Sequence, residues 1–583
     1  MTLLRQCLLD TYLVRLRVIA QFWDIELTAT RQREAALELA LAMADPQTIA
    51  LVREALSDEE GRALQALVGS GGQMPKRVFT RKWGDIRTMG PGRMERDQPW
   101  KQPISPAEGL WYKGFVFFSF EQGAEGAYEA IFVPPEIRAH LPGSDAKKPV
   151  IAVDPGPEPG AVFSTGDFLL DDACTLLSYV QNQEPRLRSG QPWPGGHGHA
   201  LLKRLRIADG AYLGFLAHLA HAIGWLVADD SGYLRLHPDS VMNWLNDTGP
   251  GQQCRLVAGW REDPTLNELF QVPSLQPEDT GAWHNDPRLA RRAILQHIAA
   301  CTPKIWYRIS DFAAAVKRVD PDFQRPAGDY ETWYIRDRDN GDYLSGFESW
   351  DAVEGRLIRY LISRPMTWLG LVDLGYDSSV EVDRSSHSAT AFRLTERGAA
   401  ILSLTEPPPS PPDRASRLRS GFRVSVPAER RYERFQIARV TEWVHSGDRY
   451  TYRLTPGALK RARQKGISVA RVLEFLDQVT AAPIPPLLES ALTRWDERGT
   501  EVRLERSVLL RLANEQLMDQ ARASRRVARL IQEQLGPTTA LVREVDWPQL
   551  VAELEAMGLL PEVTGLSDDS ETRQLTATRS RLP

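Results

Sequence analysis

The feature that most constrains the fold of this chain is a repeated succession of elements. Each copy has an apolar helix, an aromatic-rich strand, a turn, a second strand and then a new helix. The copies fall within residues 51–142, 161–250 and 285–404. Helices followed by a two-stranded wing are the layout of a winged helix. The sequence therefore predicts three tandem winged-helix-like domains and a helix-rich α+β fold.

Capping residues mark where the helices of this pattern begin. Ser57 and Glu60 have the spacing of a capping box, and Ser105 stands directly before a proline, as at many helix starts. The strand endings "YLRLHPDSV", "FRLTERGAA" and "YRLTPGALK" resemble one another. In the last two, Thr395 and Thr455 would cap the next helix. This spacing is a folding signal and alone says nothing about a ligand.

Two stretches rich in proline or glycine separate these units. They lie at residues 143–160 and 405–421. The second is predicted to be a semi-rigid linker, because its prolines fix φ and remove hydrogen-bond donors. Residues 563–583 lack an apolar period and are predicted to form a disordered tail. A chain of 583 residues is too long for one core, so several compact units are expected.

The overall charge limits what the chain can bind. Its formal net charge is -5, which argues against a polycation that coats nucleic acid, so any nucleic-acid site must be local. The four cysteines lie far apart, and no charged leader precedes an apolar block at the N-terminus. The apolar stretch 211–228 contains two His and two Gly and fits a buried helix with a hairpin better than a membrane span. A cytoplasmic protein without a membrane partner is expected.

Motifs of common enzymes are missing from the sequence. A P-loop requires a Gly-Lys dipeptide, and the chain has none. The patterns H-E-x-x-H, G-x-S-x-G and G-x-G-x-x-G do not occur either. We therefore expect a protein that is not an enzyme and that needs no cofactor.

Histidines give one hint of a metal site. His197 and His199 lie in a glycine-rich segment, while His218 and His221 are three residues apart on a predicted helix. No carboxylate or thiol stands at a matching spacing, which favours ordinary core or surface histidines. A metal-dependent hydrolase is thus the weakest of the alternatives.

Two N-terminal segments could contact nucleic acid. Residues 12–43 read as two amphipathic helices, and residues 1–50 resemble a SAP-type helical hairpin, in which Arg31 and Arg33 would stand at the start of the second helix. A plain helical hairpin that packs on the next domain is an equal alternative. In the basic loop 84–103, Arg93 and Arg96 could contact phosphates, but a solvated loop is the favoured interpretation.

A third basic segment is the most prominent. Between Arg449 and Leu473 there are seven Lys or Arg and no Asp or Glu. A strand is predicted to end here and a basic helix to follow it. The candidate phosphate contacts are Arg453, Lys460, Arg461, Arg463 and Lys465. The alternative is a solvated helix face that binds no partner.

The order of elements from Phe422 onward has a wider resemblance. We expect a strand at 422–426, a helix at 433–444, a strand at 450–455 and the basic helix from 456, and further helices and strands follow to residue 562. The residues that carry the resemblance are Tyr452, Arg453, Leu454, Thr455, Ala458, Leu459, Gly466, Phe475, Leu476, Pro483, Ile484, Pro485, Trp495, Gly499, Leu554, Gly558 and Pro561. This segment, 422–562, resembles the N-terminal, damage-recognition-like domain of XPB-type DNA helicases and of bacterial helicase-associated proteins.

The resemblance implies a mixed α/β helicase-type accessory module without the helicase motor. The first hypothesis is a non-enzymatic DNA-binding or helicase-associated protein that acts on duplex or forked DNA in DNA repair or transcription. The second is a scaffold whose winged helices dock a separately encoded helicase or nuclease.

Overall fold

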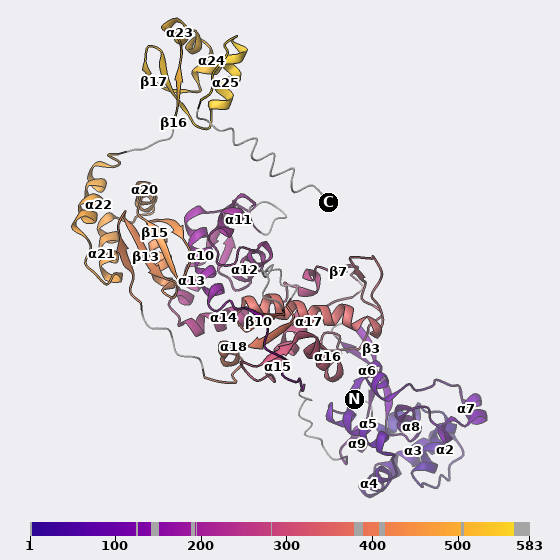
Figure 1. The fold of residues 1–583 in the computed structure, drawn as a ribbon. Helices are drawn as coiled ribbons and strands as arrows, with labels where there is room; N and C mark the ends of the chain where they lie inside the picture. The colour runs from indigo at the N-terminus through magenta and orange to yellow at the C-terminus, as the bar shows by residue number, and fades with distance from the viewer. Residues whose placement is uncertain are drawn as a thin grey trace. The chain divides into compact units, whose positions relative to one another are not determined.

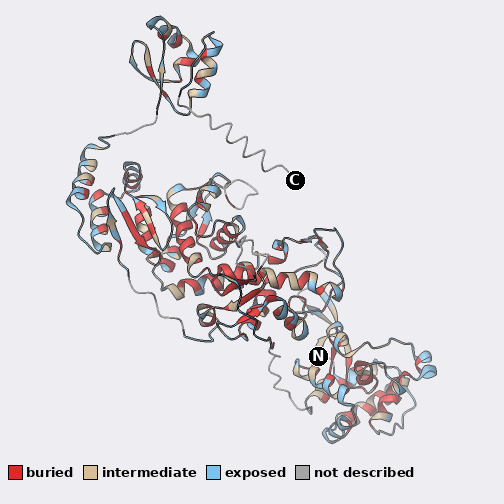
Figure 2. Ribbon diagram, viewed as in Figure 1, coloured by how far each residue is buried: buried red, intermediate tan, exposed pale blue. Residues whose placement is uncertain are grey.

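The computed structural model describes residues 3–123, 126–141, 151–187, 193, 195–281, 283–377, 389–406, 414–502 and 507–564. Parts of the two stretches rich in proline or glycine, 143–160 and 405–421, lie outside these residues. Nearly all of the predicted tail also lies outside them. The chain divides into two compact units, Met1–Pro485 and Pro486–Pro583 (Figure 1). Buried residues occupy the interior of each unit (Figure 2).

The first unit begins with helices that lead into a small sheet. The helices are α1 (Leu4–Leu9), α2 (Leu13–Phe22), α3 (Gln32–Met43), α4 (Pro46–Glu54), α5 (Asp58–Gly69), α6 (Lys76–Trp83), α7 (Pro91–Asp97), the 3-10 turn η1 (Pro99–Lys101), α8 (Pro106–Tyr112) and α9 (Pro135–Arg138). The strands β1 (Gln73–Pro75), β2 (Phe117–Gly123) and β3 (Gly126–Phe132) form an antiparallel sheet in the order β1-β3-β2.

The two helices predicted at 12–43 pack on the segment that follows them. Arg15 of α2 is buried and donates to the carbonyl oxygens of Trp111, at 2.7 Å, and Val116, at 3.2 Å. The Trp23 indole donates to the carbonyl of Lys113 at 2.7 Å. Residues 4–141 consequently share one hydrophobic core.

The middle of the first unit starts with a helical layer and a short hairpin. Its elements are β4 (Ala161–Phe163), α10 (Phe168–Gln183), α11 (Gly195–Leu202), α12 (Gly210–Ala222), β5 (Leu226–Ala228), β6 (Leu234–Leu236), α13 (Pro238–Leu245) and α14 (Gly249–Glu262). Strands β5 and β6 pair antiparallel, and an isolated bridge joins Arg186 to Tyr233. Helix α10 is buried along most of its length, so it lies at the centre of this layer.

A four-stranded sheet follows. The elements are η2 (Glu268–Gln271), β7 (Leu275–Pro277), α15 (Pro287–Ile298), β8 (Trp306–Arg308), α16 (Ile309–Val319), β9 (Ile335–Asp337), η3 (Phe347–Ser349), the π-turn η4 (Asp351–Gly355), α17 (Arg356–Leu361), the π-turn η5 (Ile362–Met366), β10 (Val372–Tyr376), β11 (Ala391–Leu394) and α18 (Glu396–Ile401). The sheet order is β4-β10-β11-β8, and β7 pairs with β9. One core extends through both middle parts.

The first unit ends with a second four-stranded sheet. Its elements are β12 (Arg417–Arg419), β13 (Arg423–Pro427), α19 (Arg431–Ala438), β14 (Glu442–His445), β15 (Arg449–Arg453), α20 (Pro456–Gln464) and α21 (Val469–Val479), in the sheet order β12-β13-β15-β14. Within the predicted linker 405–421, the last residues thus contribute strand β12.

The second unit is a small α/β domain with its own core. It contains α22 (Pro486–Arg498), β16 (Ser507–Arg511), α23 (Glu515–Ala523), α24 (Arg525–Ala528), β17 (Ile531–Gly536), β18 (Thr539–Arg543) and α25 (Trp547–Ala556). The antiparallel sheet has the order β16-β18-β17. Val527, Val542 and Leu554 are among the buried residues that join sheet and helices.

These elements confirm the helix-rich α+β class and most of the local signals. Ser57 and Glu60 form the capping box, and Thr395 and Thr455 cap α18 and α20. The expected antiparallel pairs appear as β2-β3, β5-β6 and β10-β11.

Two local predictions are wrong. Within the predicted loop 84–103, Pro91–Asp97 form helix α7 and Pro99–Lys101 form a 3-10 turn. The helix expected at 433–444 ends at Ala438, and Glu442–His445 form strand β14 instead. The Thr441 hydroxyl donates to the Ile437 carbonyl at 2.7 Å where the helix stops. Trp443 then pairs with Tyr452 of β15, because an aromatic residue among valines packs well on a sheet.

No single helix in the described part of the chain is long and apolar enough to cross a membrane. Helices α3 and α4 reach the required length only together, and a bend of 87° separates them.

Candidate nucleic-acid interface

Helix α20 carries most of the predicted phosphate contacts on its outer face. The Thr455 hydroxyl accepts from the Ala458 amide at 3.1 Å, and Pro456 occupies the first turn. The helix is followed by Gly466 at φ 78°, a left-handed conformation that suits glycine. Its inner face buries Ala458, Leu459 and Ala462. The basic residues exposed on the helix and just after it are Lys460, Arg461, Arg463 and Lys465.

Two of these cations pair with carboxylates of the same chain. The Arg461 guanidinium lies 3.5 Å from Glu442, and both side chains are about half exposed. The Lys465 ammonium lies 3.1 Å from Glu184 and donates to the Gln181 carbonyl at 2.7 Å. Such exposed pairs are weak, so a phosphate could displace the carboxylates. Hydrogen bonds from Arg235 and then Lys465 lower the pKa of Glu184.

Lys460 and Arg453 complete the cluster. Lys460 is exposed and forms no ion pair with any residue in the described ranges. Arg453 is exposed at the end of β15, where it lies opposite Arg423 on one side and Glu442 on the other. The structure thus brings all five predicted residues of this segment to the end of one strand and the helix that follows it.

A cavity of about 300 Å³ lies beside α20, between α10 and the α19–β14 segment. Its lining residues are Thr175, Ser178, Tyr179, Asn182, Gln183, Arg204, Ala438, Thr441, Glu442, Trp443, Tyr452 and Arg461. The Arg204 guanidinium lies 4.9 Å from the ring of Tyr179 and 5.3 Å from that of Trp443. Burial lowers the pKa of Arg204 and raises that of Tyr179. Aromatic and guanidinium planes next to basic side chains are typical of sites that bind unpaired bases.

Buried ion pairs attach helix α19 to helix α10. Asp171 of α10 accepts from Arg431 at 2.9 Å and from Arg434 at 3.4 Å, and all three side chains are less than 5% exposed. Arg434 also donates to the Asp171 carbonyl at 3.0 Å and lies 3.3 Å from the ring centre of Tyr450. These contacts fix α19, and the sheet that precedes α20, onto α10.

The N-terminal candidates lie on other helices. Arg93 and Arg96 are exposed on α7, with Arg93 3.1 Å and Arg96 4.0 Å from Asp97. Arg31 precedes α3 and lies 3.8 Å from Glu34, and Arg33 is exposed in its first turn. Each pair is a short exposed group of two cations, so α20 is the largest of the predicted basic clusters.

The candidate metal-binding histidines have other partners. His218 lies 2.6 Å from the Asp263 carboxylate, and His197 lies 2.9 Å from the Tyr179 hydroxyl. His221 faces the Leu226 carbonyl at 3.2 Å, and burial lowers its pKa. His199 is exposed. Across the described residues, no group of three or more His, Cys, Asp or Glu side chains could hold a metal.

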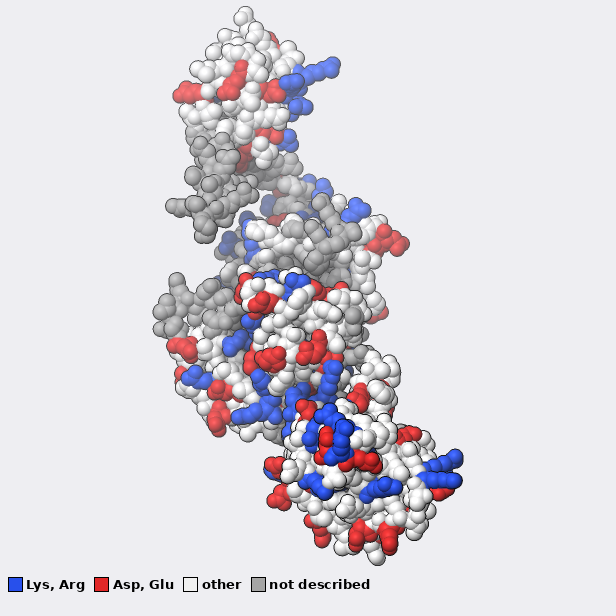
Figure 3. All heavy atoms as spheres, turned by 90° about the vertical axis from the view of Figure 1, so that its right-hand side faces the viewer, with Lys and Arg blue, Asp and Glu red and all other residues white. Residues whose placement is uncertain are grey.

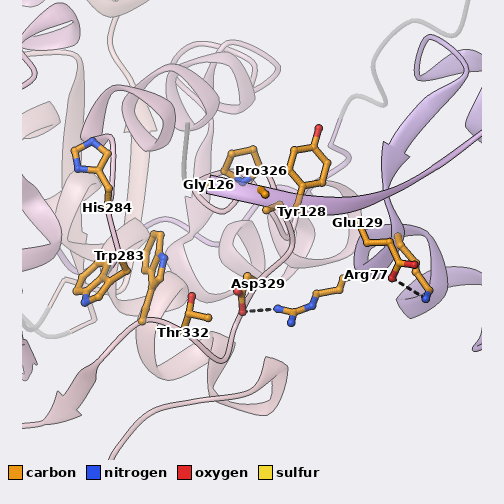
Figure 4. Close-up of a pocket in the computed structure, with 13 residues that line it drawn as sticks. Arg77, Gly126, Tyr128, Glu129, Trp283, His284, Pro326, Asp329 and Thr332 are labelled. Atoms are coloured by element: carbon orange, nitrogen blue, oxygen red, sulfur yellow. Dashed lines mark hydrogen bonds and ion pairs between the residues drawn. The ribbon is translucent and has the colours of Figure 1, made fainter. Parts of the chain in front are cut away.

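A second cavity, of about 380 Å³, lies where the N-terminal part meets the middle of the first unit. Figure 4 shows Trp283 and His284 at one end of this cavity and the Arg77 side chain reaching Asp329 at 2.6 Å. Tyr128 of β3 lies near its upper rim in this view. This cavity is lined by none of the predicted contact residues, and its main feature is the ion pair that joins the two parts.

Sequence spacing does not predict the residues that gather around α10. Arg204, Tyr179 and Trp443 come from three separate segments, and only the fold brings them together. Asp171 stands in an apolar helix, where an acidic residue amid "FLLDDACTLL" could have been recognised as a buried partner for a distant arginine.

Comparison with known families adds an independent observation. Residues 422–536 match the family described as helicase conserved C-terminal domain. None of the curated proteins is similar enough to this chain to match it. The match starts at Phe422, where the sequence predicts a resemblance to helicases to start, and it includes α20, while the XPB-type N-terminal domain stays a prediction. It identifies the segment 422–536 as helicase-related.

Proposed function

We propose that this chain is a non-enzymatic, cytoplasmic DNA-binding protein that assists a helicase. It would combine tandem winged-helix-like domains with an XPB-type N-terminal-like domain. The observation that carries the proposal is the position of α20, an exposed basic helix inside the helicase-related segment 422–536. Its cations would bind phosphates and fix the register of the protein on DNA without reading bases.

Topology supports the winged-helix part of the proposal. Elements α5, β1, α6, α8, β2 and β3 follow the order helix, strand, helix, helix, strand, strand, and the first strand pairs with the last. Elements α15, β8, α16, the helical segment 351–366, β10 and β11 repeat that order, with β9 and η3 inserted after α16, and β8 pairs with β11. In the segment between them, α10, α11 and α12 precede the β5-β6 hairpin.

The helix before each hairpin is unsuited to reading a DNA groove. In α8 the buried residues include Leu110 and Tyr112, and in α12 they include Tyr212 and Phe215. The helical segment 351–366 is also largely buried. Because base readout requires an exposed helix, these domains would support DNA contacts made elsewhere.

The test is a fluorescence-anisotropy titration of the whole chain with duplex, single-stranded and forked DNA at several salt concentrations. Each phosphate contact contributes about 0.9 to the slope of log K against log salt. The K460E/R461E/R463E variant should bind duplex DNA more weakly, with a slope shallower by about 2 to 3.

A matched control separates this site from the effect of net charge. The R17E/R53E/R62E variant reverses three exposed arginines on α2, α4 and α5, and it should retain the wild-type slope. Equal losses in both variants, or no loss at α20, would exclude α20 as the contact. Circular dichroism of each variant verifies the fold.

A scaffold that docks a separately encoded helicase or nuclease is the second candidate. Two observations favour it: Arg461 and Lys465 already face Glu442 and Glu184, and Lys and Arg are mixed with Asp and Glu on the face of the first unit shown in Figure 3. If the protein retains no DNA at moderate salt but captures a helicase or nuclease irrespective of salt, this second function holds and the first does not.

A further inference from the structure

The end of the chain contains the same small fold twice. The first copy runs β13, α19, β14, β15 and α20, and the second runs β16, α23–α24, β17, β18 and α25. In both, the first strand pairs with the last strand of the following hairpin, giving the orders β13-β15-β14 and β16-β18-β17. Both therefore share a strand, helix, hairpin, helix topology.

The closing helices of the two copies also correspond. Each has a proline in its first turn, at Pro456 in α20 and at Pro548 in α25. Each is followed by a glycine with positive φ, 78° at Gly466 and 82° at Gly558. The helicase-related segment 422–536 covers the first copy and continues through β17 of the second.

The two copies use the arginines of their first helix differently. In the first copy, Arg431 and Arg434 of α19 point inward and bind Asp171 of α10. In the second copy the corresponding helices α23 and α24, which adjoin each other in Figure 1, have their arginines on the outside. The exposed residues are Arg522, Arg525, Arg526 and Arg529.

Few groups in the second unit neutralise these four arginines. Arg522 donates to the neutral Gln534 side chain at 2.7 Å, and Arg526 lies 3.8 Å from Glu553 while 73% exposed. Arg525 and Arg529 form no ion pair with any described residue. Residues 507–564 contain six Lys or Arg and eight Asp or Glu. Four of the six positively charged residues lie within the eight positions 522–529.

We propose that α23 and α24 form a second phosphate-binding surface for DNA, separate from α20. Arg is the side chain best suited to bind phosphate oxygens in pairs, and four exposed guanidinium groups in a short segment match the spaced charges of a nucleic-acid backbone. The inference rests on the proposed function, because it assigns DNA a second contact. This contact lies in the second unit, which has its own core.

The test compares two full-length variants that lose the same charge from the second unit. R525Q/R529Q removes two arginines of the proposed surface, and R511Q/R543Q removes two exposed arginines from the sheet. We expect the slope of log K against log salt on duplex DNA to fall by about 1 to 2 in the first variant and to stay unchanged in the second.

The outcomes separate this inference from the proposed function. If K460E/R461E/R463E weakens DNA binding but R525Q/R529Q does not, the second surface is excluded while the role of α20 stands. If R525Q/R529Q and R511Q/R543Q reduce the salt slope by the same amount, the loss of net charge alone explains the reduction. This result would also overturn the inference. If the wild-type chain binds no DNA, both proposals fail, and an acidic protein becomes the candidate partner of α23 and α24.

Discussion

Asp172 is a carboxylic acid in a place where its charged form is costly. It accepts from the Arg206 amide at 2.8 Å and from the Tyr212 hydroxyl at 3.1 Å, yet it has no exposed surface. Burial raises its pKa from 3.8 to about 7. In the folded protein, the Asp172 carboxyl therefore keeps its proton over a pH range in which the same group of the unfolded chain has lost its proton.

The consequence is a stability that decreases with rising pH. The unfolded chain binds fewer protons than the folded protein between about pH 4 and about pH 7, so the contribution of Asp172 to the free energy of unfolding falls across that window. One pKa unit corresponds to about 1.4 kcal/mol, which makes the full loss on the order of 4 kcal/mol.

We predict that Asp172→Asn flattens the pH dependence of thermal unfolding in this window. The amide keeps an acceptor for the Arg206 amide but does not titrate. Unfolding midpoints of the wild type and the variant, measured across the window, check this. Asp230→Asn, which changes an exposed carboxyl, serves as the control and should follow the wild type. A variant whose midpoint falls as steeply as that of the wild type would contradict the assignment.

At the scale of single elements, the cap of α20 determines how well the basic helix is formed. Thr455→Ala removes the hydroxyl that accepts from the Ala458 amide, which should destabilise the helix by about 1 kcal/mol. Amide hydrogen exchange in residues 458–464 should accelerate roughly fivefold, and DNA affinity should decrease with it. Thr455→Ser keeps the hydroxyl and should exchange nearly as slowly as the wild type.

The elements also show what the sequence can predict here. Caps, hairpins and the basic helix depend on neighbouring residues, so Thr455 and the strand before it predict α20 correctly. The apolar composition of 211–228 correctly predicts that α12 is buried. The burial of segment 351–366 depends on what packs against it, and the sequence alone could not indicate it. The end of α19 was missed because Val440 and Val444 continue an apolar pattern that fits either a helix or a strand.

For the whole molecule, the buried contact between α10 and α19 matters most. Asp171→Asn would leave the buried Arg434 without a carboxylate partner among the described residues and Arg431 with only Asp167, at 3.8 Å. Removing one partner of a buried ion pair costs about 3 to 5 kcal/mol. We predict that this variant unfolds the first unit at lower urea concentration and leaves the second unit unchanged. Tryptophan fluorescence and hydrogen exchange of the two units check this, and an unchanged first unit would refute the role of Asp171.

The candidate site could be predicted only in part, because sequence patterns indicate only residues that are close in the chain. The five residues from Arg453 to Lys465 are close in sequence, so the pattern predicts that they lie together, at the end of β15 and along α20. The surroundings of α20, Tyr179 and Arg204, come from segments more than 200 residues away, and no spacing rule connects them to it. The second arginine group was missed because its residues lie in a segment of net negative charge.

The contact between α19 and α10 also affects how the protein can be divided. A recombinant fragment starting at Phe422, the boundary that family similarity suggests, would include Arg431, Arg434 and Phe435 but not the helix that covers them. Their buried faces would be exposed to water, and such a fragment should aggregate. The helicase-related segment therefore begins in sequence at Phe422, but its folding partner lies some 250 residues earlier, in α10. Fragments for biochemical work should retain both.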